Sequence, residues 1–312
     1  MILMRSSLAF VLAVALGTIG CAAFSSDSPD GVQVAAAFYP LQFVADRVAG
    51  GHASVSDLTT PGKEPHDLEP TVRETALIAR ADLVIHEAGL QPSIDEAVAQ
   101  NAGGQVIDAA AVVGLQPFAD AGDHSDEEIH TTDDGHDHEG DLDPHFWLDP
   151  LKMADLGDAV AVSLADIDPE NADDYRANAA SLRSDLEAVD HSYTAGLADC
   201  ARTTIVVSHD AFGYLGRYGL EIAPIAGLSP DAEPTPRDLA DLQTLITADG
   251  ITTVFGERLA PRSLTDTLAA DMGVGTAVLD PIEGLSSETE SEDYLSLMGE
   301  NLDALEEANA CQ

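Results

Sequence analysis

The stretch ENADDYRANAASLRSDLEAVDHSYTAGLAD (residues 170–199) lies between two halves of the chain that have the same organisation. It contains no Pro, and its first Gly is Gly196. The apolar or small residues that recur along it at helical spacing include Tyr175, Ala179, Leu182, Leu186 and Val189. Because this period places them on one face of a helix, we predict one long helix that joins two lobes. Two shorter helices within one domain are the alternative.

On both sides of this stretch, short apolar runs rich in β-branched residues alternate with amphipathic helical runs. The predicted strands are residues 32–38, 55–58, 83–86 and 105–107 in the first half and residues 204–208, 221–226, 252–255 and 276–279 in the second. The predicted helices include one that starts at Pro70 and others over residues 149–167, 236–248 and 262–272. Such alternation is typical of parallel sheets with helices on both faces. We therefore expect an α/β protein with one lobe over residues 32–168, a linking helix over residues 169–198 and a second lobe over residues 199–312.

The first residues of the chain predict export from the cytoplasm. Arg5 is followed by the apolar run LAFVLAVALGTI (residues 8–19). This run is shorter than the roughly 20 residues that a membrane-spanning helix needs, and it has the length of the apolar core of a signal peptide. We therefore expect a signal peptide over residues 1–20. No later segment of the sequence is apolar for long enough to cross a bilayer.

Cys21 directly follows Gly20, and this pair resembles a bacterial lipobox, in which the cysteine becomes the lipidated N-terminus of the mature chain. Thr18 departs from that pattern, which prefers Leu at the same position. We expect a lipid on Cys21 that anchors the protein to the outer side of the cell membrane, followed by a small, polar tether over residues 21–31. Secretion or a periplasmic location after ordinary cleavage is the alternative.

The net charge excludes two classes of partner. The chain has 56 acidic and 13 basic residues, which give a formal net charge of −43. Nucleic acids and anionic lipid surfaces are bound through basic footprints, so neither is expected to bind the protein's surface. Acidity by itself does not indicate a metal site, because solvated acidic faces are common.

The cysteines are informative once Cys21 is assigned to lipidation. Cys200 and Cys311 then remain as a pair in an oxidising compartment. Neither lies in a CxxC motif or a Cys/His cluster, so their spacing does not indicate a zinc site. We expect a disulfide that ties the end of the chain to the second lobe.

A segment without apolar periodicity interrupts the first lobe. Residues 120–143 are almost all Asp, Glu, Gly and His, with no Lys or Arg. The histidines of this segment are His124, His130, His136 and His138. Such a composition cannot build a core, and acidic histidine-rich tracts suit weak, exchangeable binding of divalent metals. We expect an accessory metal-binding loop outside the primary site; a solvated acidic insert with incidental histidines is the alternative.

Four residues in turns rich in Pro, Gly and Asp are candidate metal ligands. They are His66 in PGKEPHDLEP, His145 in DPHFWLDP, His209 in VVSHDAFGY and Asp280 in VLDPIEG. Three of them follow predicted strands, where ligands of open α/β sheets gather, and His145 precedes the helix predicted from residue 149. Three imidazoles and one carboxylate complete a tetrahedral shell for a borderline-soft divalent ion. Taken singly, a loop histidine is more often a surface or capping residue, and Asp280 before a proline suits the start of a turn.

In this order, PGKEPHDLEP, DPHFWLDP, SHDAFGY and LDPIEGL resemble the metal-site motifs of the zinc/manganese ABC-transporter solute-binding proteins, a family also described as zinc-uptake or adhesin-like lipoproteins. The resemblance extends from Val32 nearly to the C-terminus. It implies a C-clamp fold of two α/β lobes joined by a rigid helix, with His66, His145, His209 and Asp280 as ligands of Zn²⁺ in the cleft. It also implies a monomer that delivers the ion to an ABC permease in the membrane, driven by a cytoplasmic ATPase.

The sequence departs from the family pattern at the lipobox, at GERLAPR (residues 256–262) and at His86. At the last of these positions, such proteins often carry an aromatic or small polar residue. The departures concern the residues that surround the ligands, for which Glu64, His86 and Glu257 are the candidates.

The expected ligand set favours a binding protein over an enzyme. A catalytic zinc keeps one position open for water, whereas a fourth protein ligand closes the shell. The motifs GxSxG and HExxH are absent from the sequence. The hydrolase alternative is a zinc enzyme with three histidine ligands and Asp280 or Glu257 as general base.

Zinc is the expected metal because imidazole suits it, whereas manganese prefers oxygen-rich shells. In the manganese-binding branch of the resembling family, a carboxylate commonly takes the place of His209. A manganese or iron transport component is the first alternative, and a storage or adhesion protein that merely holds metal is the second.

Overall fold

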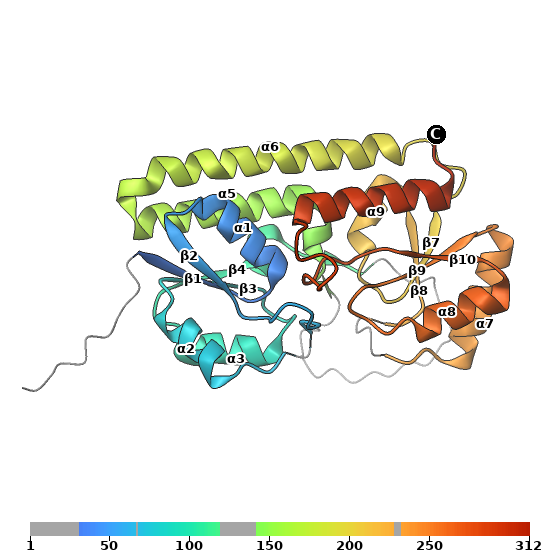
Figure 1. Cartoon of the computed structure of the whole chain (residues 1–312), viewed down its shortest axis with the longest axis horizontal. Coiled ribbons are helices and arrows are strands. Elements are labelled where there is room, and N and C mark those ends of the chain that lie inside the picture. Colours follow the sequence, from blue (N-terminus) through green and yellow to red (C-terminus); the bar gives the residue numbers. More distant parts are fainter. Residues whose placement is uncertain (1–30, 67, 119–141, 228–231) are drawn as a thin grey trace, which may run out of the picture. The chain divides into compact units, whose positions relative to one another are not determined.

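The framework of the protein consists of parallel β-sheets, as the alternation of strands and helices predicts (Figure 1). The computed structural model describes residues 31–66, 68–118, 142–227 and 232–312. The expected signal peptide, Cys21, the tether up to residue 30, and the histidines of the acidic loop lie outside these ranges. Those expectations therefore stay predictions.

Within the described ranges, each half of the chain contributes one four-stranded parallel sheet. The first sheet has the order β2-β1-β3-β4 and consists of β1 (Val32–Ala36), β2 (Ala53–Asp57), β3 (Leu83–His86) and β4 (Gln105–Asp108). The second has the order β10-β9-β7-β8 and consists of β7 (Thr204–Val207), β8 (Glu221–Pro224), β9 (Thr253–Gly256) and β10 (Gly275–Val278). All of the predicted strands are present within two residues of their expected starts and ends. A short antiparallel pair that the sequence did not predict joins β5 (Gln116–Pro117) to β6 (Leu142–Asp143), and β6 consists of the last two residues of the acidic segment.

Helices connect the strands and cover the sheets (Figure 1). They are α1 (Tyr39–Ala49), α2 (Val72–Arg80), α3 (Pro92–Asn101), α4 (Ala109–Val113), α5 (Pro150–Ile167), α6 (Ala172–Gly196), α7 (Pro236–Ala248), α8 (Ser263–Met272) and α9 (Tyr294–Asn309), with 3-10 turns η1 (Phe146–Leu148), η2 (Pro169–Asn171) and η3 (Gly213–Tyr218). Helix α2 begins two residues later than predicted. Its N-cap is Thr71, whose hydroxyl accepts a hydrogen bond from the Glu74 amide while the Glu74 carboxylate accepts one from the Thr71 amide. This reciprocal cap satisfies two free amides and fixes the start of the helix.

The long helix expected between the halves is α6, and the face predicted to be apolar is the face that is buried against other elements. Tyr175, Leu182 and Leu186 are fully buried along it. Near its start, Asn178 donates a hydrogen bond to the Val48 carbonyl at the end of α1. Near its end, the Tyr193 hydroxyl donates one to the carbonyl of Met298 in α9. The helix therefore contacts helices that belong to both halves of the chain.

One hydrophobic core runs from the first sheet into the second. Buried residues of both halves, such as Leu83, Ile205, Phe255 and Tyr294, belong to the same packed cluster. Each Å² of apolar surface that is buried in such a core stabilises the fold by about 25 cal/mol. Here the shared core also fixes the loops at the strand ends relative to each other. Residues 31–312 pack together as one unit, so the boundaries of the two expected lobes stay an interpretation of the sequence. No helix in the described ranges combines the length and apolar character that a membrane crossing requires.

The expected disulfide joins Cys200 to Cys311. The chain around it is held by further backbone contacts, since the amides of Ala201 and Arg202 both donate hydrogen bonds to the Asn309 carbonyl. The bond therefore fixes the end of α9 to the segment between α6 and β7.

Replacing both cysteines with serine should lower the free energy of unfolding by up to about 4–5 kcal/mol, because the bond closes a loop of 111 residues in the unfolded chain. Denaturant unfolding of the Cys200→Ser/Cys311→Ser variant and the wild type measures the difference. Thiol titration of unfolded, unreduced protein should find neither cysteine free, and two reactive thiols would contradict the assignment.

Candidate metal centre

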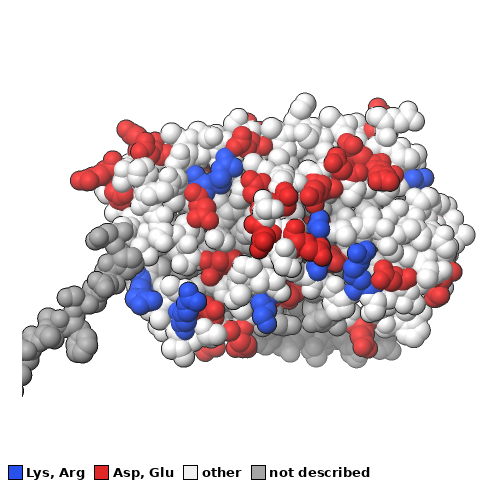
Figure 2. Space-filling model, in the orientation of Figure 1, with Lys and Arg blue, Asp and Glu red and all other residues white. Residues whose placement is uncertain are grey.

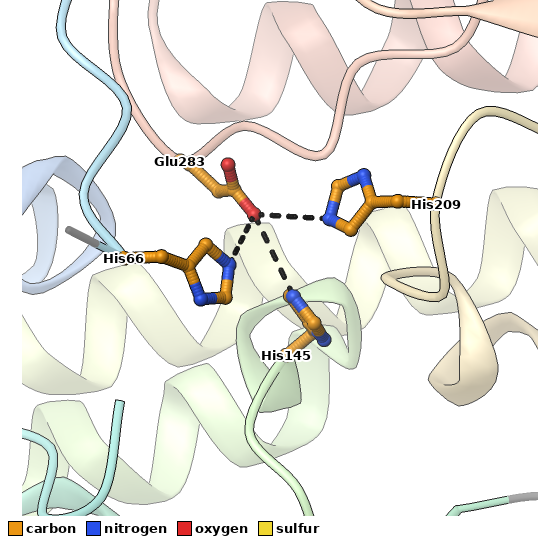
Figure 3. A group of neighbouring side chains, drawn as sticks. All are labelled: His66, His145, His209 and Glu283. Atoms are coloured by element: carbon orange, nitrogen blue, oxygen red, sulfur yellow. Dashed lines mark ion pairs between the residues drawn. The ribbon is translucent and has the colours of Figure 1, made fainter. Parts of the chain in front are cut away.

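Four side chains from separate parts of the sequence point at one another in the interior (Figure 3). The Oε1 atom of Glu283 lies 3.4 Å from Nε2 of His66, 3.6 Å from Nε2 of His145 and 3.6 Å from Nε2 of His209. All four atoms lie within 4.8 Å of one another. In a tetrahedral zinc shell with metal–ligand distances of about 2.0–2.1 Å, neighbouring ligand atoms lie about 3.3–3.4 Å apart. The spacing therefore suits a small divalent cation at the centre of the group.

The fold brings these residues together because each lies in a loop that leaves one of the two sheets or precedes a helix. His66 lies between β2 and α2, His145 directly before η1, His209 two residues after β7, and Glu283 in the loop after β10. The carboxyl ends of parallel strands open on the same edge of a sheet, which is where α/β proteins bind their ligands. The three histidines thus meet as the sequence predicted.

The converging atoms are buried and have no hydrogen-bond partner among the described residues. The side chains of His145 and His209 are fully buried, and those of Glu283 and His66 are 2% and 9% exposed. The three Nε2 atoms and Glu283 Oε1 all lack a partner. Buried polar atoms are nearly always paired, so four unpaired ones that face a common point indicate a site for a ligand that pairs with all of them. A cation meets that requirement.

Acidic side chains fix the orientation of two of the imidazoles. Nδ1 of His145 lies 2.9 Å from Oδ1 of Asp143, and Nδ1 of His209 is hydrogen-bonded to Oε1 of Glu257. A carboxylate at Nδ1 selects the tautomer with the proton on that nitrogen, which leaves Nε2 free to bind a metal. Glu257, a candidate from the sequence, thus contacts a histidine of the group. Asp143 was not predicted, because it ends the acidic segment and resembles its neighbours there.

Glu64 and His86, the other two residues that the sequence predicted around the ligands, differ in whether they contact the group. Glu64 accepts a hydrogen bond from the backbone amide of His66, and its Oε1 lies 3.8 Å from His66 Nε2. Glu64 therefore lies next to His66, at the edge of the group of converging side chains. His86 lies at the end of β3, and its Nδ1 lies 2.8 Å from Oδ1 of Asp95. Its ring therefore pairs with Asp95 and not with a histidine of the group.

The carboxylates strongly affect the protonation of the imidazoles. Burial opposes the charged form of His209, but the carboxylates of Glu257 and Glu283 raise its pKa to about 10. Burial likewise opposes the charged form of His66, and Glu283 and Glu64 raise its pKa above the ordinary value. Burial would raise the pKa of Glu283, but His209 and His66 lower it below its ordinary range. Burial raises the pKa of Glu64 to about 7 despite the opposing effect of His66.

Asp280, the expected carboxylate ligand, is not a member of the group. Its Oδ2 accepts a hydrogen bond from Arg258 Nε at 3.0 Å, and its Oδ1 accepts one from the Ile282 amide at 2.8 Å. Burial raises its pKa to about 6, although the Ile282 amide and Arg258 favour the charged form. Both carboxylate oxygens are therefore engaged elsewhere, and the turn that Asp280 starts carries Glu283 into the fourth position. The alternative explanation of Asp280 as a turn residue is the one that the structure supports.

The fold and the site together define a class of protein in which loops of two α/β halves bring buried groups suited to a divalent metal ion to one point. The family described as "Zinc-uptake complex component A periplasmic" matches residues 34–308, and the chain belongs to this family. This family is the one that the sequence motifs resemble.

Relatives that are similar to the chain over most of its length have names that refer to zinc. The zinc-binding lipoprotein AdcA of Streptococcus pneumoniae serotype 4 is 31% identical over 307 residues, which are 97% of this chain and 60% of AdcA. The high-affinity zinc uptake system protein ZnuA of Bacillus subtilis is 31% identical over 306 residues, 96% of this chain and 94% of that protein. The chain thus spans about 60% of the length of that AdcA and nearly all of ZnuA.

Solved structures agree with this assignment. Zn(II)-bound AdcA from S. pneumoniae superposes with a TM-score of 0.73 at 30% identity, covering 89% of this chain and 58% of that one. The laminin-binding protein Lmb of Streptococcus agalactiae, described as an adhesin with metal-transporting activity, superposes with a TM-score of 0.77 at 25% identity, covering 89% and 99%.

Glu283→Ala should weaken zinc binding at least about tenfold, roughly 1.4 kcal/mol, because it removes the charged member of the group. The matched variant Asp280→Asn should change zinc affinity by less than about threefold, since its amide oxygen can still accept from the Ile282 amide. Competition titration with a chromophoric chelator measures both. A larger loss of zinc affinity in Asp280→Asn than in Glu283→Ala would indicate that Asp280, and not Glu283, is the fourth ligand.

Zinc affinity should rise with pH across the neutral range. With its pKa raised to about 10, His209 carries a proton at pH 7 that a cation must displace, while Glu283, with its lowered pKa, is already ionised. The apparent affinity should therefore increase up to about tenfold per pH unit for each displaced proton, and fall as the pH is lowered. Calorimetry at pH 7 in buffers of different ionisation enthalpy counts the released protons. The control variant His52→Gln, which alters a histidine paired with Asp174 on α6, should release the same number.

Proposed function

We propose that this chain is the extracytoplasmic solute-binding component of an ABC importer, which captures Zn²⁺ and delivers it to a membrane permease. His66, His145, His209 and Glu283 are the proposed ligands. The observation that carries the proposal is the convergence of their four buried, unpartnered atoms at distances that suit a tetrahedral cation. The zinc-binding names of the AdcA and ZnuA relatives support it.

The chemistry of the ligand set favours zinc over manganese. Three neutral imidazoles and one carboxylate contribute a charge of −1 against the +2 of the ion, and the buried carboxylates of Asp143 and Glu257 lie just behind two of the rings. Imidazole nitrogen suits zinc, copper and nickel, whereas manganese favours oxygen ligands. A single carboxylate oxygen among the four ligand atoms is therefore a poor shell for manganese. Transport of manganese or iron remains the alternative function.

The closed shell also supports a carrier over a hydrolase. Four protein ligands leave no open position for an activated water. The two proposed general bases are engaged elsewhere, because Glu257 is hydrogen-bonded to His209 and Ser208 and Asp280 to Arg258. Transfer of the intact ion is the function that such a site serves.

The proposed setting is the outer side of the cell membrane, with a lipid on Cys21 as anchor and a permease with its ATPase as partners. The lipoprotein name of the AdcA relative supports the anchor. The formal net charge of the chain is −43, and Figure 2 shows acidic side chains across the drawn face, with a group near its centre and basic side chains at several places among them. Such a surface raises the local concentration of cations and speeds their capture at low ionic strength. It also disfavours nucleic acid as a partner.

Protein purified without chelator should contain about one tightly held zinc ion per chain by elemental analysis. His209→Ala should weaken zinc by at least about tenfold because it opens a coordination position to water, and His209→Glu should shift the preference toward manganese. Competition titrations at fixed pH compare both variants with wild type, and His191→Gln on the exposed face of α6 is the control. Manganese in place of zinc in the purified protein, or unchanged zinc affinity in both His209 variants, would contradict the assignment.

A further inference from the structure

The turn that carries Glu283 has an unusual backbone. Ile282 adopts a left-handed conformation with φ of 59°, and its side chain is fully buried. For a β-branched residue such a φ is a genuine outlier, because its Cβ crowds the backbone. Conformations of this kind persist only where the surrounding structure determines them, and they gather at ligand-binding positions.

Several hydrogen bonds hold this turn in its left-handed conformation. The Asp280 carboxylate accepts from the Ile282 amide at 2.8 Å. The Asn301 side chain accepts from the Asp280 amide at 2.8 Å and donates to the Asp280 carbonyl at 2.7 Å. The Trp147 indole donates to the Pro281 carbonyl at 2.7 Å. Every backbone hydrogen-bonding group of Asp280 and Pro281 is therefore occupied by a buried side chain.

These contacts connect the turn to two other parts of the site. Asn301 lies on α9, where Glu300 also pairs with Arg258, the residue that binds Asp280. Trp147 lies two residues after His145, and its ring packs against the His145 imidazole with centroids 5.2 Å apart. The hydrogen bond from Trp147 to Pro281 thus fixes the loop of the carboxylate relative to the loop of one histidine.

We propose that Asp280, Asn301 and Trp147 are positioning residues that give the site its preference for zinc over manganese, by holding the strained turn and with it Glu283 Oε1. This proposal rests on the proposed function. An oxygen fixed at 3.4–3.6 Å from three imidazole nitrogens fits a four-coordinate ion. A carboxylate on a loose turn could rotate, bind through both oxygens and admit water. Those changes produce the oxygen-rich, higher-coordinate shell that manganese prefers.

Asp280→Ala and Trp147→Phe test the proposal. The first removes the acceptor for the Ile282 amide, and the second removes the donor to Pro281 while keeping an aromatic ring. Asp280→Asn keeps an acceptor for the Ile282 amide but removes the charge and turns an NH2 group toward Arg258, so the hydrogen bond from Arg258 Nε is lost. The control is Tyr193→Phe, which removes the buried hydrogen bond to Met298 between α6 and α9.

Two measurements separate positioning from a general structural effect. The first is the ratio of zinc to manganese affinity from competition titrations, since partial unfolding lowers both affinities by the same factor. The second is the visible absorption of bound Co²⁺, which is much stronger in four-coordinate than in six-coordinate sites. Asp280→Ala should lower the affinity ratio at least about tenfold and weaken the cobalt absorption. Trp147→Phe should change both in the same direction, and Asp280→Asn and Tyr193→Phe should leave both near wild type.

An unchanged ratio and spectrum in both Asp280→Ala and Trp147→Phe would overturn the positioning role while leaving zinc capture intact. Equal losses in Asp280→Asn and Asp280→Ala would also overturn it, because the charge and its pairing with Arg258, and not the contact with the Ile282 amide, would then set selectivity. If Asp280→Ala does not fold, Trp147→Phe decides alone. Failure of the wild type itself to prefer zinc would instead contradict the proposed function.

Discussion

Burying the Glu283 carboxylate against three imidazoles is the constraint around which this protein is arranged. A buried charge is costly unless it is paired, and here the facing nitrogens can pair with it only as protonated rings or through a shared cation. Asp143 and Glu257 behind two of the rings increase the demand for positive charge. A divalent ion satisfies this demand with one particle, whereas protons must be distributed over several rings. The same electrostatics thus explains the raised pKa of His209 and the suitability of the site for a metal.

The scaffold meets this constraint by making the two sheets parts of one packed body. The four converging side chains come from loops of both halves, so their spacing depends on how firmly the halves are joined. Helix α6 is bonded to α1 near its start and to α9 near its end, and the hydrophobic core is continuous between the sheets. Precise ligand placement therefore comes from rigid elements behind the loops, which is the arrangement that metal sites need.

The sequence predicted the fold and three of the four side chains that converge in the interior, and the reasons are physical. Strand and helix alternation depends on local periodicity, and His66, His145 and His209 lie in loops whose turn-rich sequences place them beside strand or helix ends. Glu283 was missed because the choice between it and Asp280 depends on the left-handed turn at Ile282, which no period reveals. The available signal was the Asp-Pro pair itself: an aspartate that starts a turn directs its carboxylate to its own backbone, so the next acidic residue was the better candidate. The contact of His86 with Asp95 could not be predicted either, because it depends on how α3 packs beside the end of β3.

The dispersion of the ligands along the chain has a consequence for how the protein matures. His66 and Glu283 are separated by most of the sequence, and the loops that carry them are in place only after both sheets have formed. Contacts between such distant residues are completed late in folding, because closing long loops is entropically costly before other contacts exist. A cation that needs all four of the proposed ligands cannot guide the chain toward its fold. Under the proposed function it would bind the finished molecule and slow its unfolding, so a chain that has folded wrongly would not compete at this site for the metal.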